Sequence, residues 1–277
     1  MREEPREERT PVRGQTLIAL LAGCAALAGC NRAPPSHGPS AHAPDPLAGY
    51  LQPPQVVQAD RRGQTVQLTI AAAPGSVIRL ASPDGAAITG AADRKGAASL
   101  AAPAGPSPRL YSLSEMVGGR LARAVGYVAV LPAPGPPAAL LRPAAAAALP
   151  STRAAAERGL LAVDYDASGA AMASGRAGPS ETVRLLLDGK DTGEDPADAA
   201  GVFSASLSKA LTPGPHVLSA AGQRLRASIA FTAARPTGLA NTFFEATRLD
   251  SAWRIDWLTP GGGVQSTILF DQRGGPG

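Results

Sequence analysis

The stretch that decides the fold is ETVRLLLDGKDTGEDPADAAGVFSASL, residues 181–207. Its apolar residues Val183, Leu185 and Leu187 alternate with their neighbours, which is the period of a strand with one buried face. Asp188-Gly189 supplies the positive φ that a tight turn needs. A second Asp-to-Gly turn, ADAAG, then precedes another alternating run, VFSASL. The stretch therefore predicts short antiparallel strands that are joined by tight turns.

The same order of landmarks occurs a second time, about 104 residues upstream. The segments VIRL, DG and ADRKG match TVRL, DG and ADAAG, at residues 77–80, 84–85 and 92–96 against residues 182–185, 188–189 and 197–201. Each unit also begins after a turn that is rich in Pro, Gly and Ser. A matched order at one offset indicates an internal repeat. Short strands between frequent turn signals favour a β-sandwich for each unit.

Both units resemble the bacterial Ig-like domains that recur in surface proteins. In those domains a Pro-Gly turn precedes a VxLxxDG strand, and an ADxxG turn and a PGxH segment follow it. The second unit matches this pattern well, down to Pro213-Gly214-Pro215-His216, whereas the first unit matches it more weakly and lacks the aromatic residue at Ala98 and the His. Neither unit has the Cys…Trp…Cys core of antibody domains. The resemblance implies an all-β fold with two tandem Ig-like β-sandwiches.

The predicted organisation has six parts. They are a signal peptide (1–29), a flexible tether (30–54), a first Ig-like repeat (55–131), a Pro/Ala-rich linker (132–158), a second Ig-like repeat (159–232) and a C-terminal β meander (233–277). The tether lacks the apolar pattern of a folded segment. Alternation from Trp253 to Trp257 and from Val264 to Phe270 predicts a three-stranded meander. Because three strands need a partner surface, we expect the meander to pack on the second repeat.

The N-terminal segment has the features of a secretion signal. Arg13 precedes the apolar run TLIALLAGCAALA, residues 16–28, which as a helix would be about 20 Å long and so shorter than the roughly 30 Å core of a bilayer. The run ends in Leu27-Ala28-Gly29-Cys30, which resembles the lipobox of bacterial lipoproteins. The resemblance implies that Cys30 is acylated, becomes the mature N-terminus and anchors the protein to a membrane.

A second copy of the box lies upstream, at Leu21-Ala22-Gly23-Cys24. Cleavage before Cys24 would leave an apolar region shorter than signal peptides use, so we expect Cys30 to be the lipidated cysteine. Several acyl chains hold a protein firmly, where one would not. Asn31 follows Cys30, and in enteric bacteria an Asp at that position favours retention in the inner membrane. The resemblance therefore implies a cell-envelope protein of the outer membrane in preference to the inner membrane.

Charge and composition argue against several classes of function. The chain has 26 Lys and Arg and 22 Asp and Glu, for a formal net charge of +4, without the basic stripe that nucleic-acid binding uses. Both cysteines, Cys24 and Cys30, lie in the N-terminal apolar segment, so the exported part has no disulfide and no thiol pair for zinc. Walker, G-x-S-x-G and H-E-x-x-H motifs are absent from the sequence. We expect no catalysis and no cofactor.

Two sets of residues are candidates for binding. Trp253 and Trp257 share a strand face and could stack on sugar rings, although paired aromatics at this spacing more often close a small core. Asp188, Asp191 and Asp195 lie in an acidic loop and are weak calcium candidates, since Ca²⁺ prefers six to eight oxygen ligands. Their spacing does not fit an EF-hand, and a lysine lies among them. A solvated loop is therefore the favoured interpretation, and no metal site is predicted.

The predicted function is that of a lipid-anchored cell-envelope protein with a structural, adhesive or protein-binding role. The expected partners are the membrane, through the anchor, and another envelope protein, but not nucleic acid. The alternative is a glycan-binding envelope lipoprotein that uses the face of Trp253 and Trp257. His216, the one histidine of the repeats, is expected to be a partly exposed residue at the start of a strand, because the sequence nominates no catalytic or metal partner for it.

Overall fold

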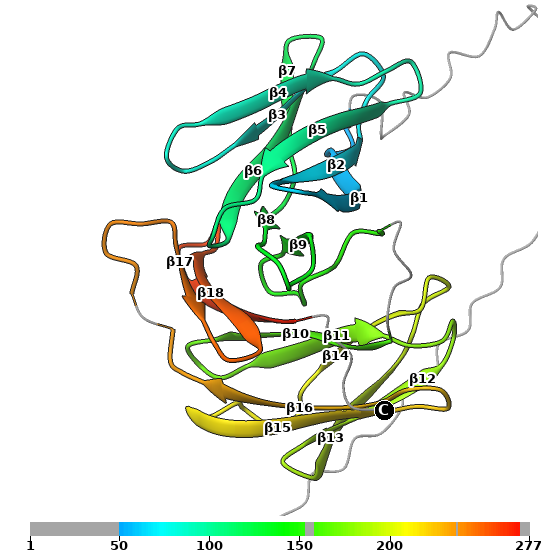
Figure 1. The fold of residues 1–277 in the computed structure, drawn as a ribbon, viewed down its shortest axis with the longest axis vertical. Coiled ribbons are helices and arrows are strands. Elements are labelled where there is room, and N and C mark those ends of the chain that lie inside the picture. Colours follow the sequence, from blue (N-terminus) through cyan, green and yellow to red (C-terminus); the bar gives the residue numbers. More distant parts are fainter. Residues whose placement is uncertain (1–49, 153–157, 237, 272–277) are drawn as a thin grey trace, which may run out of the picture. The chain divides into compact units, whose positions relative to one another are not determined.

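The structure is a computed structural model that describes residues 50–152, 158–236 and 238–271. These residues form 19 strands, β1 to β19, in four antiparallel sheets (Figure 1). None of the described residues belongs to a helix that is long and apolar enough to cross a membrane. The all-β class predicted from the sequence is confirmed. Cys30, the predicted signal peptide and residues 31–49 of the tether lie outside the described residues.

The first sandwich packs a three-stranded sheet, in the order β1-β2-β5, against a sheet in the order β4-β3-β6-β8-β9, in which β7 also pairs with β6. The strands are β1 (Gln55–Arg62), β2 (Thr65–Ala71), β3 (Val77–Ala81), β4 (Ala87–Ala91), β5 (Ala97–Pro103), β6 (Arg109–Val117), β7 (Arg120–Arg123), β8 (Tyr127–Val130) and β9 (Ala138–Leu141). Alternate residues of β2 and β3 point inward, so that Leu68, Ile70, Ile78 and Leu80 are fully buried between the sheets. Burial of such side chains typically contributes about 1.5–3 kcal/mol each.

The second sandwich packs a sheet in the order β14-β11-β10-β19-β18-β17 against a sheet in the order β13-β12-β15-β16. The strands are β10 (Gly159–Asp166), β11 (Ala171–Arg176), β12 (Thr182–Leu187), β13 (Lys190–Pro196), β14 (Val202–Ser206), β15 (Gly214–Ala221), β16 (Arg226–Ala233), β17 (Phe244–Arg248), β18 (Ala252–Leu258) and β19 (Val264–Phe270). Val183, Leu185 and Leu187 line its core, which confirms the face that their alternation predicted.

The predicted Asp-to-Gly turns carry the same hydrogen bonds in both sandwiches. The Asp93 carboxylate accepts the backbone N–H groups of Lys95 and Ala97 at 2.7 and 2.9 Å. The Asp198 carboxylate accepts the backbone N–H groups of Ala200 and Val202 at 2.8 and 2.9 Å. Each of these positions in the second sandwich follows its equivalent in the first by 105 residues. The matched landmarks of the sequence are thus one structural unit that is used twice.

A buried carboxylate also holds the Pro-containing turn before β3 and before β12, but the two units supply it from different strands. In the first unit Glu115, on β6, accepts the backbone N–H of Ala73 at 2.8 Å. In the second unit Glu181, just before β12, accepts the backbone N–H of the equivalent residue, Gly178, at 2.8 Å. Gly222 occupies the position equivalent to Glu115, and a Cβ there would collide with the Glu181 carboxylate. The two units share the hydrogen bond and not the residue that makes it.

The glycines of two turns in the second unit offer a matched pair for mutation. Gly189 and Gly201 both have positive φ, at 75° and 79°. A Cβ on Gly189 would meet no atom within 4 Å, whereas a Cβ on Gly201 would lie 2.5 Å from the carbonyl oxygen of Ala177. We expect Gly189→Ala to lower the free energy of unfolding by about 1–2 kcal/mol, the cost of left-handed backbone alone. Gly201→Ala should cost clearly more, because the turn must also move away from a backbone atom. Urea denaturation measures both values, and equal losses would contradict the close approach.

The meander β17-β18-β19 exists, but its packing differs from the prediction. It does not lie on the second sandwich as a separate layer, because β19 pairs with β10 and continues that sheet. The outer face of this sheet packs on the β6, β8 and β9 end of the first sandwich. We call this contact the junction; its buried residues are Leu110, Ala129, Leu131, Ala139, Leu141, Ala147, Ala162, Trp253, Ile255, Trp257 and Leu269. Strands β10, β18 and β19 are therefore buried on both faces, which one-sided alternation did not predict.

The predicted linker, residues 132–158, is wrong over most of its described length. Strand β9 pairs with β8 at the edge of the first sandwich, and Ala147 is buried in the junction. Ser151 then bonds back to β1, since its N–H and its hydroxyl both reach the carbonyl oxygen of Val57, at 3.0 and 2.6 Å. The prolines that suggested a linker only keep this segment irregular. Its small alanine side chains allow the backbone to lie close against its neighbours.

Candidate functional site

Both candidate tryptophans are buried in the junction. Trp253 is 8% exposed and Trp257 is 0% exposed. The indole N–H of Trp257 donates to the Thr267 hydroxyl at 3.1 Å, and the Tyr127 ring stands edge-on to the indole, with 5.8 Å between ring centroids. The Arg248 guanidinium lies 5.5 Å from the ring centroid of Trp253. A sugar ring cannot stack on side chains that are already covered, so the proposed glycan face is wrong and core packing is confirmed.

A carboxylate that the sequence did not single out lies beside these rings. One oxygen of Asp164, on β10, accepts the backbone N–H of Ala147 at 2.7 Å. The other accepts the Thr267 hydroxyl at 2.6 Å and the Gln265 amide at 3.4 Å. Burial raises the pKa of Asp164 to about 6, against the opposing effect of these hydrogen bonds. Asp164 was missed because charged residues in a strand-like run such as LLAVDYD, residues 160–166, are typical of solvent-facing positions.

His216 and Asp188 form a hydrogen-bonded pair of ionisable side chains in the second sandwich. Nδ1 of His216 lies 2.8 Å from an Asp188 carboxylate oxygen, and Nε2 lies 2.7 Å from the carbonyl oxygen of Thr212. Both partners are acceptors, so the geometry suits an imidazolium that donates from both nitrogens. Burial lowers the pKa of His216, but the hydrogen bonds to Thr212 and Asp188 outweigh it and leave the pKa raised. His216 is thus buried and structural, and the prediction that it is partly exposed is wrong.

The calcium candidates do not converge on a common point. Asp188 is bound to the histidine just described, Asp191 pairs with Arg184, and Asp195 accepts the backbone N–H of Ser204 at 3.1 Å. Within the described ranges, no three His, Cys, Asp or Glu side chains form a group that could hold a metal ion. The acidic loop gives each carboxylate its own partner and does not bring them together around a cation.

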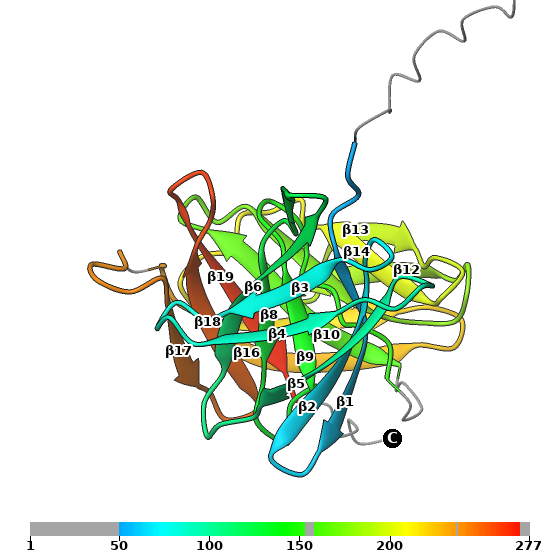
Figure 2. The ribbon, with the colours of Figure 1, turned by 90° about the horizontal axis from the view of Figure 1, so that it is seen from above.

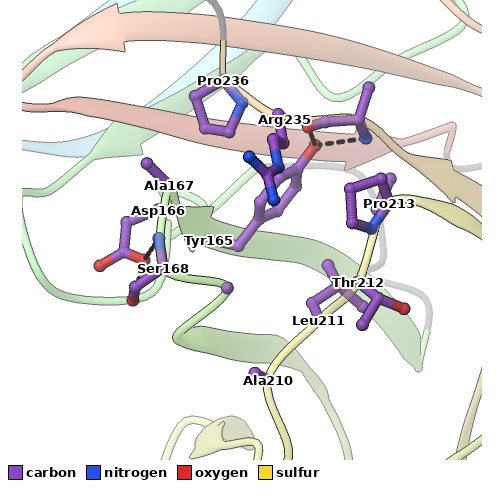
Figure 3. A pocket seen from close by; sticks show the side chains of 13 residues that line it. Tyr165, Asp166, Ala167, Ser168, Ala210, Leu211, Thr212, Pro213, Arg235 and Pro236 are labelled. Atoms are coloured by element: carbon purple, nitrogen blue, oxygen red, sulfur yellow. Dashed lines mark hydrogen bonds between the residues drawn. The ribbon is translucent and has the colours of Figure 1, made fainter.

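A small pocket of about 140 Å³ opens at one end of the second sandwich (Figure 3). Loops at residues 166–169, 210–213 and 233–236 line it. The Tyr165 hydroxyl donates to the carbonyl oxygen of Ala234 at 3.0 Å, and the Asp166 carboxylate accepts from Ser168. Ligand pockets usually measure about 300–1,000 Å³, so this pocket is small for one. The Tyr165 and Asp166 side chains in its lining already bind the protein itself.

The outer face of the β3, β6 and β7 strands is open and carries an apolar row. Val77 pairs with Met116 and Met116 pairs with Leu121, so the three side chains are neighbours on one face. Their exposed fractions are 53%, 43% and 50%. Arg79 and Arg123 lie in the next row, on either side of Ser114. We call Val77, Arg79, Met116, Leu121 and Arg123 the open face. The sequence did not indicate it, because no single segment contains all of these residues.

No family model matches the chain, and no curated protein matches it. Among the solved structures that are similar to it, three have the following low identities and coverages. One is titled "Biofilm associated protein - BSP domain". Its sequence is 12% identical, the TM-score is 0.23, and the match covers 67% of this chain and 30% of that structure's chain. Another is titled "Ca2+-stabilized adhesin helps an Antarctic bacterium reach out and bind ice". Its sequence is 12% identical, the TM-score is 0.21, and the match covers 79% of this chain and 65% of that structure's chain.

The third structure is titled "Central Fibronectin-III array of RIM-binding protein". Its sequence is 11% identical, the TM-score is 0.26, and the match covers 79% of this chain and 89% of that structure's chain. The chain therefore spans less than two thirds of the first two structures and most of the third. At TM-scores this low the likenesses carry no argument about what the protein binds.

Proposed function

We propose that the chain is a lipid-anchored cell-envelope protein with a structural, adhesive or protein-binding role and without catalytic activity. The observation that carries this proposal is the junction. It buries two indole rings and nine further apolar residues between the two sandwiches. Interfaces between domains of one chain are more often polar and permit relative motion. An apolar junction of this kind fixes the two sandwiches to each other and suits a protein that presents its outer surfaces in a constant arrangement.

The use that the protein makes of its ionisable groups also supports a non-catalytic role. His216 fixes the turn at Asp188, Asp164 binds the backbone at Ala147, and Glu181 holds the turn at Gly178. Catalytic acids and bases must reach a substrate in a cleft. Each of these three groups instead satisfies a polar group of the protein itself.

The lipid anchor is proposed from the LAGC boxes and is tested by mutation. We expect Cys30→Ser to abolish acylation and release the protein from the membrane fraction, because the acylated sulfur is lost. Cys24→Ser is the matched control and should leave both unchanged. Labelling of growing cells with an alkyne fatty acid reads out acylation directly. Loss of label in Cys24→Ser alone would move the anchor to Cys24, and label retained in both variants would refute the anchor.

The proposed location is the cell envelope, with the outer membrane favoured over the inner membrane because Asn31 follows Cys30. The proposed partner is another envelope protein. Density separation of the two membranes tests the location. Cross-linking in intact cells, followed by purification of the anchored protein, tests the partner. Recovery of the uncross-linked protein alone would argue against a protein-binding role.

A further inference from the structure

We propose that the open face is a membrane-contact site, where the first sandwich rests on an anionic phospholipid surface. This inference deepens the proposed function and depends on the proposed lipid anchor. The contact would set the orientation of the two-sandwich body relative to the membrane. It is supported by the place where the chain enters the first sandwich, the charge of that end and of each sandwich, the exposed apolar row, the equivalent face of the second sandwich and the length of the predicted tether.

The chain enters the first sandwich at the end that bears the open face. Figure 2 shows the first described residues, in blue, leading straight into β1. The first residue of β1, Gln55, pairs with Ala71, the last residue of β2. The turn after β2 leads directly to Val77, which pairs with Met116 near the end of β6. Leu110, near the other end of β6, lies in the junction. An anchor upstream of Gln55 would therefore bring the open face, and not the junction, toward the membrane.

The same end of the sandwich is basic. Arg94 and Lys95 lie in the turn between β4 and β5, which bonds to the turn before β3. With Arg79 and Arg123 they place four cationic side chains around the apolar row. The acidic side chain of this turn, Asp93, is occupied by backbone N–H groups of the turn itself. Cationic side chains near an anionic leaflet each strengthen binding roughly fivefold.

The net charge of the whole first sandwich is also more positive than that of the second sandwich. Residues 50–152 contain nine Lys and Arg and four Asp and Glu, for a net charge of +5, whereas residues 158–271 contain ten and twelve, for a net charge of −2. An anionic surface therefore attracts the first sandwich and not the second. Tyr50, which is 69% exposed and precedes β1, adds an aromatic side chain of the kind that sits at lipid headgroups.

The second sandwich shows that the fold does not require the apolar row. Arg79 pairs with Ser114 in the first unit, and Arg184 pairs with Ala221 in the second. By this register Thr182 and Gln223 are the equivalents of Val77 and Met116. Both are exposed, and both are polar. Since the same sheet is formed with polar residues at these positions, the apolar pair of the first unit has a role other than packing.

The length of the predicted tether favours a membrane over a soluble acidic partner. Nineteen residues separate Cys30 from Tyr50. A chain of that composition and length has a root-mean-square end-to-end distance on the order of 25 Å, so an acylated Cys30 would hold Tyr50, on average, within about that distance of the lipid surface. A mixture of apolar and basic side chains is what interfacial segments use to bind anionic lipids. An acidic protein partner would bind the same apolar and basic side chains. The test below distinguishes such a partner from a lipid surface.

The test uses the full lipidated protein in vesicles of phosphatidylcholine, with or without phosphatidylglycerol. One cysteine is introduced by Leu121→Cys and carries a polarity-sensitive fluorophore; the matched control is Gln223→Cys in the second sandwich. We expect the label at 121 to shift to the blue and resist aqueous quenchers in anionic vesicles, and to revert in high salt. The label at 223 should stay exposed to water in both vesicles.

Two sets of substitutions separate the contributions. Arg79→Gln with Arg123→Gln should lower the ratio of docked to undocked protein roughly fivefold for each arginine. Val77→Thr with Met116→Gln installs the residues of the second unit, so it should keep the fold, as a far-UV spectrum and a thermal melt verify, and should reduce docking.

Three outcomes would overturn the inference. If the protein floats with the vesicles but the label at 121 remains exposed to water, the contact is wrong while the anchor stands. If the protein does not float, the anchor and the contact both fail. If the label at 121 is shielded in native envelope membranes but not in protein-free anionic vesicles, the occupant of the open face is an acidic protein and not the lipid.

Discussion

Trp257→Ala is expected to lower the free energy of unfolding by about 3–5 kcal/mol, a large share of the 5–15 kcal/mol typical of a folded domain. Trp257 is fully buried, and its removal leaves a cavity between the two sandwiches. It also removes the N–H that binds the Thr267 hydroxyl, which in turn binds the buried Asp164. Urea denaturation that is followed by far-UV circular dichroism measures the loss.

Two control variants make this result specific to the junction. Phe243→Ala removes a ring that is 54% exposed and should change stability little. Trp257→Phe keeps most of the buried ring and should recover a large part of the loss. A denaturation curve of Trp257→Ala that overlays that of the parent protein would mean that the junction contributes nothing to stability, and the proposal of a fixed two-sandwich body would fail with it.

The contribution of Asp164 to the free energy of unfolding is expected to fall as the pH rises from about 4 to about 6. Burial raises the pKa of Asp164 from 3.8 in an exposed chain to about 6 in the fold. The folded state therefore binds the proton more tightly than the unfolded state does, and folding is favoured while Asp164 is protonated. As the pH passes through the folded pKa, a contribution of about 3 kcal/mol is lost. Denaturation curves across this pH range measure the fall.

Asp164→Asn isolates this contribution from that of the other carboxylates. Asparagine is similar in size and can still accept the Ala147 N–H, but it carries no titrating proton. The difference in stability between the parent and Asp164→Asn should change over the same pH range and level off above it. A difference that stays constant with pH would show that Asp164 does not titrate there, and would contradict the raised pKa.

The sequence predicted those parts of the fold that local chemistry decides. Alternation at Val183, Leu185 and Leu187 identified the core face of a strand. Asp188-Gly189 has φ values of 52° and 75°, as a tight hairpin turn requires. The Asp-x-x-Gly turns form in both units because the aspartate binds N–H groups two and four residues further along. These features depend on a few neighbouring residues, and a short stretch of sequence contains all of them.

The junction could not be predicted in this way. Alternation shows which face of a strand is apolar but does not show what covers it, so Trp253 and Trp257 fitted either a core or a ligand face. The covering surface comes partly from residues 138–147, whose alanines and single proline carry no strand pattern. The burial of Asp164 was not predicted for the same reason. A charged residue is expected to be exposed, and the segment that buries Asp164 is distant in the sequence.

The candidate site followed the same division. His216 was placed correctly at the start of a strand, but its burial depends on Phe231 and Asp188, which lie far from it in the sequence. The open face combines Val77 with Met116 and Leu121 only through strand register. Register between distant segments is set by the whole sheet, and one segment does not reveal it.

The exchange of the buried carboxylate between Glu115 and Glu181 gives each unit an identity that its neighbour lacks. If the second unit's strand, with Glu181, were to pair in the first sandwich, it would bring a second carboxylate to the turn that Glu115 already serves. The reciprocal hybrid would combine Ser76 with Gly222 and leave a turn without any carboxylate. Two buried like charges lower the stability of the fold, and so does a buried N–H without a hydrogen-bond acceptor. Tandem copies of one fold can exchange strands as they fold. The different position of the carboxylate in each unit disfavours this exchange, because each turn is satisfied only by the strand of its own unit.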